Sequence, residues 1–349
     1  MPGLAGIIGN VSKAENAQKL NVMIQSMMHE KFYNSGSYVN EEMGLYFGWV
    51  ILKGSSVDCM PIWNERKNKC ILFYGENFPH DKAIDDLRIR GHKFLLGDLS
   101  YLIHLYEELG DDFFLALNGF FCGIVIDLAR NEVTLFNDRY GMQRIYYNES
   151  DGTFLFCSEA KALLKTCKKL REIDHSSLGQ LLSMGCVLGD RTLFRNVKLL
   201  PGGHLWRFRK ARCEERKRYF DRKEWENQGI LNAEDFYGEL RTTFRKIVPR
   251  YVDCREPVGV SLTGGLDTRL IMAYVSRGDG LLPCYTFGGM YHDSFDVKSR
   301  ERLQKRADRS IPLYELGKSF CQSFLTLRQR RSLSAMEILM LGVVLRNYT

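Results

Sequence analysis

Several patterns that would assign this 349-residue sequence to a common class are missing from it. Its ten cysteines include no Cys-x-x-Cys pair, which argues against a zinc knuckle or a dithiol redox motif. No apolar run reaches the roughly 20 residues that a membrane-spanning helix needs, and no signal peptide is recognisable. Cysteines without a secretory signal are typical of a reducing compartment, so we expect a cytoplasmic protein with no membrane partner.

An excess of one charge is also missing. The chain has 49 basic and 42 acidic residues, and its net charge of +7 is spread along the sequence. The densest basic run, 207–217, lacks the strong clustering that a nucleic-acid-binding surface needs. We therefore expect no nucleic-acid partner, and only a weak preference for anionic ligands such as ATP.

The first part of the chain is rich in short strand patterns. Apolar runs at 44–52 and 120–126 are bounded by Gly, Asn or Asp, and the Glu-Ser-Asp-Gly run at 149–152 is a hairpin turn signal. Between them, apolar residues at helical spacing predict a helix near 102–109 that ends at Gly110. Strands in succession with interleaved helices predict an α+β fold with antiparallel sheets.

The pattern changes after about residue 220. Asn232 can cap a helix, and 257–262 and 283–287 are short strand patterns separated by a helical stretch at 269–276. Alternating strands and helices predict a parallel sheet with crossover helices. We therefore divide the chain into a first domain at 1–215, a linker at 216–230 and a second domain at 231–349.

A glycine turn joins the first of these strands to its helix. Residues 261–268 read Ser-Leu-Thr-Gly-Gly-Leu-Asp-Thr, without the Gly-Lys-Ser/Thr of a Walker A loop. A helix N-terminus presents N–H groups to phosphate, and the two glycines let the backbone approach a ligand closely. Thr263 and Thr268 add hydroxyl donors, and Asp267 can hold Mg²⁺. The alternative is a tight strand–helix turn in which Asp267 is only the helix N-cap.

This loop is similar to the Ser-Gly-Gly-x-Asp-Ser pyrophosphate loop of ATP pyrophosphatases, with threonine at both serine positions. The chain as a whole resembles the asparagine synthetases, whose motifs occur here in the same order. Strand and turn residues of this kind can also serve packing alone. The stretches that carry the resemblance are Leu-Ala-Gly-Ile at 4–7, Asp-Arg-Tyr-Gly-Met-Gln-Arg-Ile-Tyr-Tyr at 138–147, Phe-Cys-Ser-Glu-Ala-Lys-Ala-Leu at 156–163, Leu-Leu-Pro-Gly-Gly-His at 199–204, Arg-Tyr-Phe at 218–220 and Tyr-Thr-Phe-Gly at 285–288.

The resemblance implies an Ntn-hydrolase-like sandwich, with antiparallel sheets between helices, followed by an α/β parallel-sheet, Rossmann-like ATP pyrophosphatase domain. In this family a carboxylate, aspartate by default, is activated with ATP and Mg²⁺ as an acyl-adenylate. Ammonia, released from glutamine in the first domain, then attacks it. By matching position, Asp267 is the Mg²⁺ ligand and the ATP-binding residues are Leu262, Thr263, Gly264, Gly265, Leu266, Asp267, Thr268 and Phe287, with Leu262 and Phe287 on the adenine side.

The first domain departs from the family at its catalytic positions. The family's glutaminase uses a cysteine at residue 2 as nucleophile, whereas Pro2 stands here, so that position offers no catalytic residue. The arginine of the family's Arg-Leu-Ser-Ile strand is replaced within 47–50, and its Arg-Gly-Pro-Asp segment is not visible in 31–39. The oxyanion-hole Asn-Gly-Glu reads Tyr-Gly-Glu at 74–76, and only Asp98 remains of an Asp-Thr-Glu. We therefore expect this domain not to hydrolyse glutamine.

Two functions fit these patterns. The first is an ATP-dependent carbon–nitrogen ligase of the asparagine synthase type, which adenylates a carboxylate and uses free ammonia or an amine. The second is a truncated or degenerate non-catalytic homologue that at most binds nucleotide or a partner protein. The family's synthetase domain continues past this length, and the apolar run 338–345 resembles a core helix without its cover, so a partner chain that completes the domain is one expectation. An ATP pyrophosphatase that modifies nucleic acid lacks support, because such enzymes carry no Ntn-like first domain.

Overall fold

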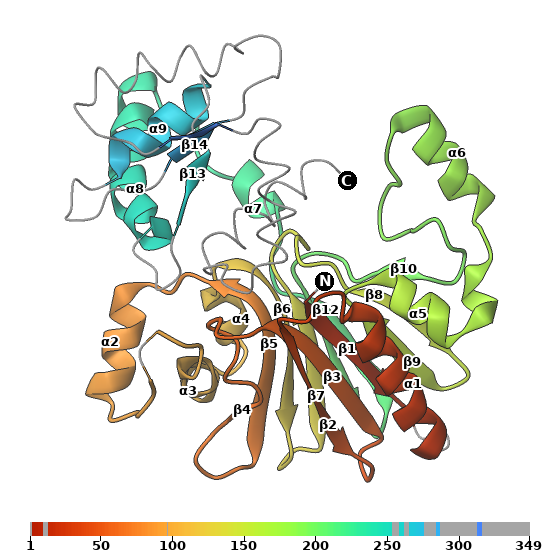
Figure 1. The fold of residues 1–349 in the computed structure, drawn as a ribbon. Coiled ribbons are helices and arrows are strands. Elements are labelled where there is room, and N and C mark those ends of the chain that lie inside the picture. The colour runs from red at the N-terminus through yellow and green to blue at the C-terminus, as the bar shows by residue number, and fades with distance from the viewer. Residues whose placement is uncertain are drawn as a thin grey trace. The chain divides into compact units, whose positions relative to one another are not determined.

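The computed structural model describes residues 2–9, 13–95, 97–252, 258–261, 265–275, 284–286 and 313–315 (Figure 1). The chain divides into two compact units, Met1–Gln228 and Gly229–Thr349. Within the ranges given above, no helix combines the length and the apolar character needed to cross a membrane.

Two six-stranded sheets form the first unit, and the strand pairings within them are antiparallel. The first sheet has the order β10-β8-β9-β1-β3-β2, and the second has the order β12-β11-β7-β6-β5-β4. The antiparallel α+β architecture expected for this part of the chain is confirmed. The strands are β1 (Gly3–Ile8), β2 (Tyr33–Asn40), β3 (Leu45–Leu52), β4 (Ile62–Trp63), β5 (Lys69–Asn77), β6 (Gly119–Asp127), β7 (Glu132–Asn137), β8 (Tyr146–Ser150), β9 (Thr153–Cys157), β10 (Lys198–Leu199), β11 (His204–Arg209) and β12 (Arg212–Arg218).

Helices cover the outer faces of the two sheets (Figure 1). Met23 of α1 (Lys13–Met27) packs against the first sheet in a cluster separate from the main core. On the second sheet, the ring of Phe114 in α4 (Asp112–Ala116) lies 5.1 Å from that of Phe136. The unit also contains α2 (Asp81–Ile89), α3 (Tyr101–Leu109), α5 (Ala160–Thr166), the 3₁₀ turn η1 (Lys168–Arg171), α6 (His175–Met184) and α7 (Lys223–Glu226).

Alternate residues of the strands fill the space between the sheets. Phe47 of β3 and Phe156 of β9 are fully buried, and their ring centroids lie 5.9 Å apart. Phe154 reaches across to Phe208 of the opposite sheet at 4.8 Å. A Cβ at Gly6 would lie 2.3 Å from the Phe156 ring, so glycine makes room for this aromatic layer. The layer fixes the register that places the start of β1 between β3 and β9.

Local signals set two chain reversals of the first unit. Asp151 and Gly152 have φ values of 51° and 71° at the tip of the β8–β9 hairpin, where Ser150 pairs with Thr153. Such paired positive φ values are typical of a two-residue hairpin loop. Gly110 ends α3 with φ 55° and donates its N–H to the Tyr106 carbonyl at 2.9 Å. The predicted hairpin turn and helix stop are both confirmed.

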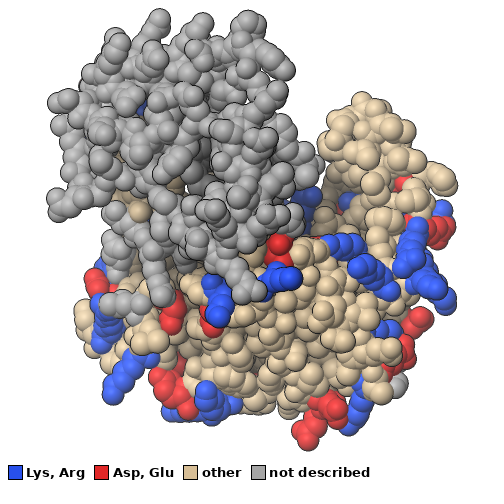
Figure 2. Space-filling model, in the orientation of Figure 1, with Lys and Arg blue, Asp and Glu red and all other residues tan. Residues whose placement is uncertain are grey.

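Charged side chains of both signs are interspersed over the face that Figure 2 shows. Several charged side chains of the first unit pair across strands and loops. Arg216 on β12 pairs with Glu149, and Lys217 lies 3.5 Å from Asp111. Exposed pairs of this kind contribute little stability each, on the order of 1 kcal/mol or less.

The second unit contains a three-stranded parallel sheet of order β13-β14-β15. Asn232 caps the first helix by accepting the Asp235 N–H at 2.9 Å, as predicted. The parallel pairing agrees with the alternation of strands and helices in the sequence, whereas the Rossmann-like class of the whole unit stays a prediction. The apolar run 338–345 lies outside the described residues. The elements described are α8 (Ala233–Val252), β13 (Val260–Ser261), α9 (Leu266–Tyr274), β14 (Cys284–Thr286) and β15 (Leu313–Glu315).

Candidate functional site

Pro2 lies half-buried directly before β1, at the position that the resemblance assigns to a nucleophile. The Leu4 N–H donates to Ser158 Oγ at 2.9 Å, and the Ser158 N–H donates to the Leu4 carbonyl at 2.8 Å. These two bonds hold β1 against the residue that follows β9. Proline has no N–H, and this costs nothing here because the ladder begins at Gly3. The start of β1 is therefore well anchored and carries no thiol or hydroxyl at residue 2.

Two thiols lie near the start of β1. Cys122 Sγ is 4.0 Å from Ser158 Oγ, and Cys157 Sγ is 3.5 Å from the sulfur of Met27. Both cysteines are fully buried, and burial raises the pKa of each thiol to about 12. A thiol with so high a pKa stays protonated at neutral pH, and the thiolate is the nucleophilic form.

A charged cluster follows Ser158 in the chain. His29 Nε2 lies 3.0 Å from Glu159 Oε1, and Lys161 Nζ lies 3.1 Å from Glu159 Oε2. Burial alone would raise the pKa of Glu159. Hydrogen bonds from basic neighbours, His29 and Lys161 among them, outweigh burial and hold that pKa below its usual range. The cluster ties the segment after α1 to the beginning of α5.

The stretches in which the resemblance places the family's glutamine-binding residues serve packing or local turns here. Phe47, within the stretch that replaces the family's arginine strand, is fully buried in the layer between the sheets. Residues 33–39, in the stretch without the Arg-Gly-Pro-Asp segment, belong to β2. A Cβ at Gly36 of β2 would lie 2.4 Å from the Trp49 ring, so this strand closes over a tryptophan. Asp98 Oδ1 accepts the Ser100 N–H at 2.8 Å in the turn before α3.

The segment at 74–76, which the resemblance matches to the family's oxyanion hole, joins β5 closely to β6. Gly75 has φ 117°, and a Cβ there would lie 2.0 Å from the Phe120 carbonyl oxygen. Only glycine tolerates this close approach of β5 and β6. Asn77, at the end of β5, accepts the Asn118 N–H and donates to the Tyr101 hydroxyl, both at 2.7 Å. Burial raises the pKa of that hydroxyl far above its ordinary value, so it stays protonated.

The motif at 138–147 forms a closed polar turn. Asp138 is fully buried, and its carboxylate accepts the N–H groups of Tyr140 and Met142 at 3.0 Å and of Gln143 at 2.9 Å. Its backbone carbonyl accepts the Gly203 N–H at 2.8 Å. All of these bonds are internal, so the motif joins two loops and has a structural role.

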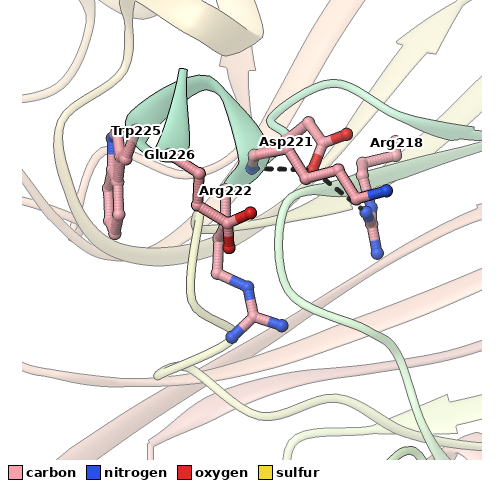
Figure 3. Close-up of a pocket in the computed structure, with 6 residues that line it drawn as sticks. Arg218, Asp221, Arg222, Trp225 and Glu226 are labelled. Atoms are coloured by element: carbon pink, nitrogen blue, oxygen red, sulfur yellow. Dashed lines mark hydrogen bonds and ion pairs between the residues drawn. The ribbon is translucent and has the colours of Figure 1, made fainter. Parts of the chain in front are cut away.

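A cavity of about 540 Å³ opens at the end of the first unit (Figure 3). Within its lining, Asp221 Oδ1 accepts from the Arg218 guanidinium at 3.3 Å and from the Lys223 N–H at 3.1 Å. Sequence reasoning did not single out this cavity, because its lining resembles an ordinary charged helix start. Its lining residues are Arg218, Asp221, Arg222, Lys223, Trp225 and Glu226.

The glycine loop of the second unit leads directly into α9. Gly265 is the N-cap, with φ −66° and ψ 158°, and α9 begins at Leu266 rather than at the predicted 269. Asp267 lies exposed in the first turn, so its assignment as the N-cap is wrong, whereas the alternative of a purely structural turn stays open. The Arg269 Nε donates to the Gly265 carbonyl at 3.2 Å. Thr268 is half-buried in the same turn, whereas the predicted ATP-binding positions Leu262, Thr263, Gly264 and Phe287 lie outside the described residues.

The first unit is a sandwich of two antiparallel sheets with helices on its outer faces. Its N-terminal strand, β1, lies in the interior of one sheet. The model of the glutamine amidotransferase domain matches residues 1–220, and the chain belongs to this family.

Among full-length proteins, the chain is similar to asparagine synthetases. "Asparagine synthetase [glutamine-hydrolyzing] 3" of Bacillus subtilis (strain 168) is 27% identical over 239 residues, covering 64% of this chain and 37% of the relative. A probable asparagine synthetase of Dictyostelium discoideum is 25% identical over 286 residues, or 79% of this chain and 46% of the relative. The resemblance to the asparagine synthetases is thus confirmed, and the chain spans less than half the length of these relatives.

Among solved structures, similarity is found to glutamine phosphoribosylpyrophosphate amidotransferase from B. subtilis. The TM-score is 0.43 at 11% sequence identity, over 62% of this chain and 49% of that chain.

Proposed function

We propose that this protein is an asparagine-synthetase-like ligase that forms an amide from a carboxylate, ATP and free ammonia or an amine, without hydrolysing glutamine. The observation that carries the proposal is Pro2 directly before β1, where the family has a cysteine, while the buried thiols of Cys122 and Cys157 stay protonated. Glutamine hydrolysis by covalent catalysis needs an activated nucleophile at that point. Without one, nitrogen has to reach the ligase from solution.

The positions around residue 2 support the same conclusion. Phe47 is packed in the aromatic interior, and Asp98 is engaged in a local turn. A glutamine amide placed at the start of β1 would thus lack both the nucleophile and the family's charged clamp. Several losses at separate positions favour an abandoned site over one that uses a different nucleophile.

The second unit supplies the residues for ATP in this proposal. β13 ends at Ser261 and α9 begins at Leu266, so the glycine loop leads into a helix N-terminus whose first turn is exposed. The dipole and the N–H groups of that turn favour phosphate. The exposed carboxylate of Asp267 would hold Mg²⁺, and Gly265 lets the phosphates approach the backbone. ATP bound there supplies the adenylyl group for the carboxylate.

The proposal is tested by measuring pyrophosphate release from MgATP with aspartate, and then with a panel of other carboxylates, in ammonium or in glutamine. We expect release that depends on ammonium and on a carboxylate. Asp267→Asn should lower it by more than about tenfold, as loss of a metal ligand does. Asp235→Asn, at the start of the neighbouring helix α8, is the matched control and should leave the rate unchanged.

Glutamine is the discriminating substrate. We expect no glutamate release from the wild type above a heat-treated sample, and none from Pro2→Cys, because a new thiol does not restore the clamp at Phe47. Glutamate release by the wild type would refute the loss of glutaminase activity. Binding of MgATP without pyrophosphate release for any carboxylate would instead favour the non-catalytic homologue that binds nucleotide.

A further inference from the structure

The edges of the two sheets in the first unit differ in how well they are protected against pairing with another chain. An edge strand exposes unpaired backbone N–H and C=O groups, and short length, charge, proline or a bulge usually blocks them. β4 and β10 have only two residues each. β12 is charged at every position except Cys213, and its pairing with β11 shifts register between Arg207 and Phe208. The fourth edge strand, β2, has none of these protections.

β2 is a long and uncharged edge. Its eight residues include no proline and no charged side chain. It pairs with β3 over its whole length without a shift of register. It ends the order of the first sheet, so no described strand pairs with its other side. The strand therefore offers a continuous row of backbone groups for pairing.

Local hydrogen bonds indicate which backbone groups of β2 point away from β3. The Tyr33 N–H donates to the Glu30 carbonyl at 3.3 Å. The carbonyl of Leu52, which lies opposite Tyr33, accepts the N–H and the hydroxyl of Ser55 at 3.2 and 2.7 Å. Tyr33 and Leu52 thus form a non-hydrogen-bonded pair, and every second residue from Tyr33 onward turns its backbone groups outward. The outward groups further along the strand belong to Ser35, Ser37 and Val39.

A second copy of β2 fits this edge in the antiparallel direction. Outward groups have to face outward groups, so a two-fold axis has to pass through a residue of β2 rather than between two residues. With the axis at Gly36, Ser35 faces Ser37 of the second copy, and each pair can exchange two N–H···O bonds. Tyr33 then faces Val39, and an aromatic residue opposite a β-branched one is a favourable cross-strand pair. Gly36 meets its own copy with no side chain between the strands.

The charges beside the strand suit the same register. Two residues further out, this pairing brings Lys31 opposite Glu41 of the second copy at both ends. Both side chains are exposed, and Glu41 also pairs through Oε2 with Lys13 of its own chain at 2.7 Å. An axis at the next outward-facing position would place Lys31 opposite Met43 and lose this complementarity. The pattern of charge therefore favours a second copy of the chain in one register.

We propose that β2 is a self-association surface, through which two copies of the chain pair antiparallel about a two-fold axis at Gly36. The pairing joins the first sheets of the two copies into one continuous sheet and covers the unprotected edge of each. It uses neither the start of β1 nor the glycine loop, so it does not depend on the proposed function.

Sedimentation velocity of the full-length protein over a range of concentrations measures the association. We expect a monomer–dimer equilibrium. Ser37→Pro removes an outward N–H and leaves the bonds to β3 in place, because proline is tolerated on the free side of an edge strand. Each dimer loses two bonds, so the dissociation constant should rise about tenfold or more. Ser37→Thr keeps the N–H and is the matched control, and an unchanged urea midpoint for Ser37→Pro shows that the fold is kept.

Cysteine pairing tests the register. Ser35→Cys and Ser37→Cys are made separately in a Cys186→Ser background, which removes an exposed thiol. Residues opposite each other in a hydrogen-bonded pair lie about 5.5 Å apart at Cα, within reach of a disulfide. We expect the mixture of the two variants to form a cross-linked dimer under mild oxidation faster than either variant alone.

Three results would overturn the proposal. A protein that stays monomeric at every concentration would leave the edge to an extended segment of a different protein. A dimer that Ser37→Pro does not weaken would use another surface. Cross-linking of Ser37→Cys with itself ahead of the mixture would place the axis at residue 37 instead of Gly36.

Discussion

The buried carboxylate of Asp138 offers the sharpest test of how the first unit is held together. It accepts three backbone N–H groups in one turn, and its own carbonyl accepts two more, from Gly141 and Gly203. Asp138→Asn keeps the size and one oxygen but points an amide NH₂ at an N–H donor. Oδ1 carries two of the bonds and Oδ2 one, so whichever way the amide is placed, at least one N–H loses its acceptor.

The cost follows from these bonds. A hydrogen bond to a charged acceptor contributes about 1.5–3 kcal/mol, and a buried donor left unpaired costs a further 1–3 kcal/mol or so. Neutralising the buried carboxylate removes part of its desolvation cost and offsets some of this. We therefore expect Asp138→Asn to lower the free energy of unfolding by about 2–4 kcal/mol, and Tm by roughly 5–15 °C for a unit of this size.

Urea unfolding monitored by tryptophan fluorescence measures this cost directly. The four tryptophans of the chain, Trp49, Trp63, Trp206 and Trp225, all lie in the unit Met1–Gln228, so the signal reports on that unit alone. Asp151→Asn is the matched control. Asp151 is exposed with φ 51°, a conformation that asparagine also adopts readily, so a change within about 0.5 kcal/mol is expected. An equally small change for Asp138→Asn would show that the turn does not depend on the carboxylate.

Three further predictions use the same unit. Gly75→Ala should cost about 3 kcal/mol or more in urea unfolding, because its Cβ would overlap a carbonyl of β6, whereas Gly152→Ala, with φ 71° and open space, should cost about 1–2 kcal/mol. The depressed pKa of Glu159 adds stability that is present above its unfolded value of 4.5 and is lost as pH falls below it; Glu159→Gln should thus destabilise by up to about 1 kcal/mol at pH 7 and by less at pH 3, whereas an equal effect at both would contradict the assignment. Iodoacetamide at pH 8 should modify Cys186, which is exposed, and leave Cys122 unmodified in the native protein, since burial raises the Cys122 pKa to about 12; peptide mass spectrometry reads both sites.

Elements that depend on local chemistry could be predicted from the sequence. The hairpin at Asp151–Gly152, the helix stop at Gly110 and the cap at Asn232 each follow from backbone preferences of a few residues, and each is present. The strand order could not be predicted, because β1 pairs with β9 some 150 residues away through packing of the aromatic interior. Periodicity reports which residues are buried but not which buried faces meet.

The candidate sites also divide into features that local chemistry predicts and features that depend on tertiary packing. Pro2 could be assigned because a covalent mechanism requires a thiol there, whatever the surroundings. The structural role of Asp138 could not be predicted, because the motif does not show which backbone N–H groups point at its carboxylate. His104 and Glu107 stand three residues apart on one helix, a spacing that places their side chains on one face. The contacts of His104 with His92 and Glu65 depend on tertiary packing, which one sequence does not contain.

The residues that hold the sandwich together differ from those that would carry glutaminase chemistry, so the fold does not depend on that chemistry. Gly75 and Asp138 are confined by close backbone contacts, so replacing either one disrupts the fold. Pro2 lies before the first paired residue of β1 and takes no part in the strand pairing, so we expect a change there to have little effect on stability. Conservation of the buried packing alone would therefore be enough to give the match to the amidotransferase family over 1–220. Because the family is recognised mainly through its scaffold, the match alone does not identify the reaction. The reaction is identified by measuring which nitrogen donor the protein accepts.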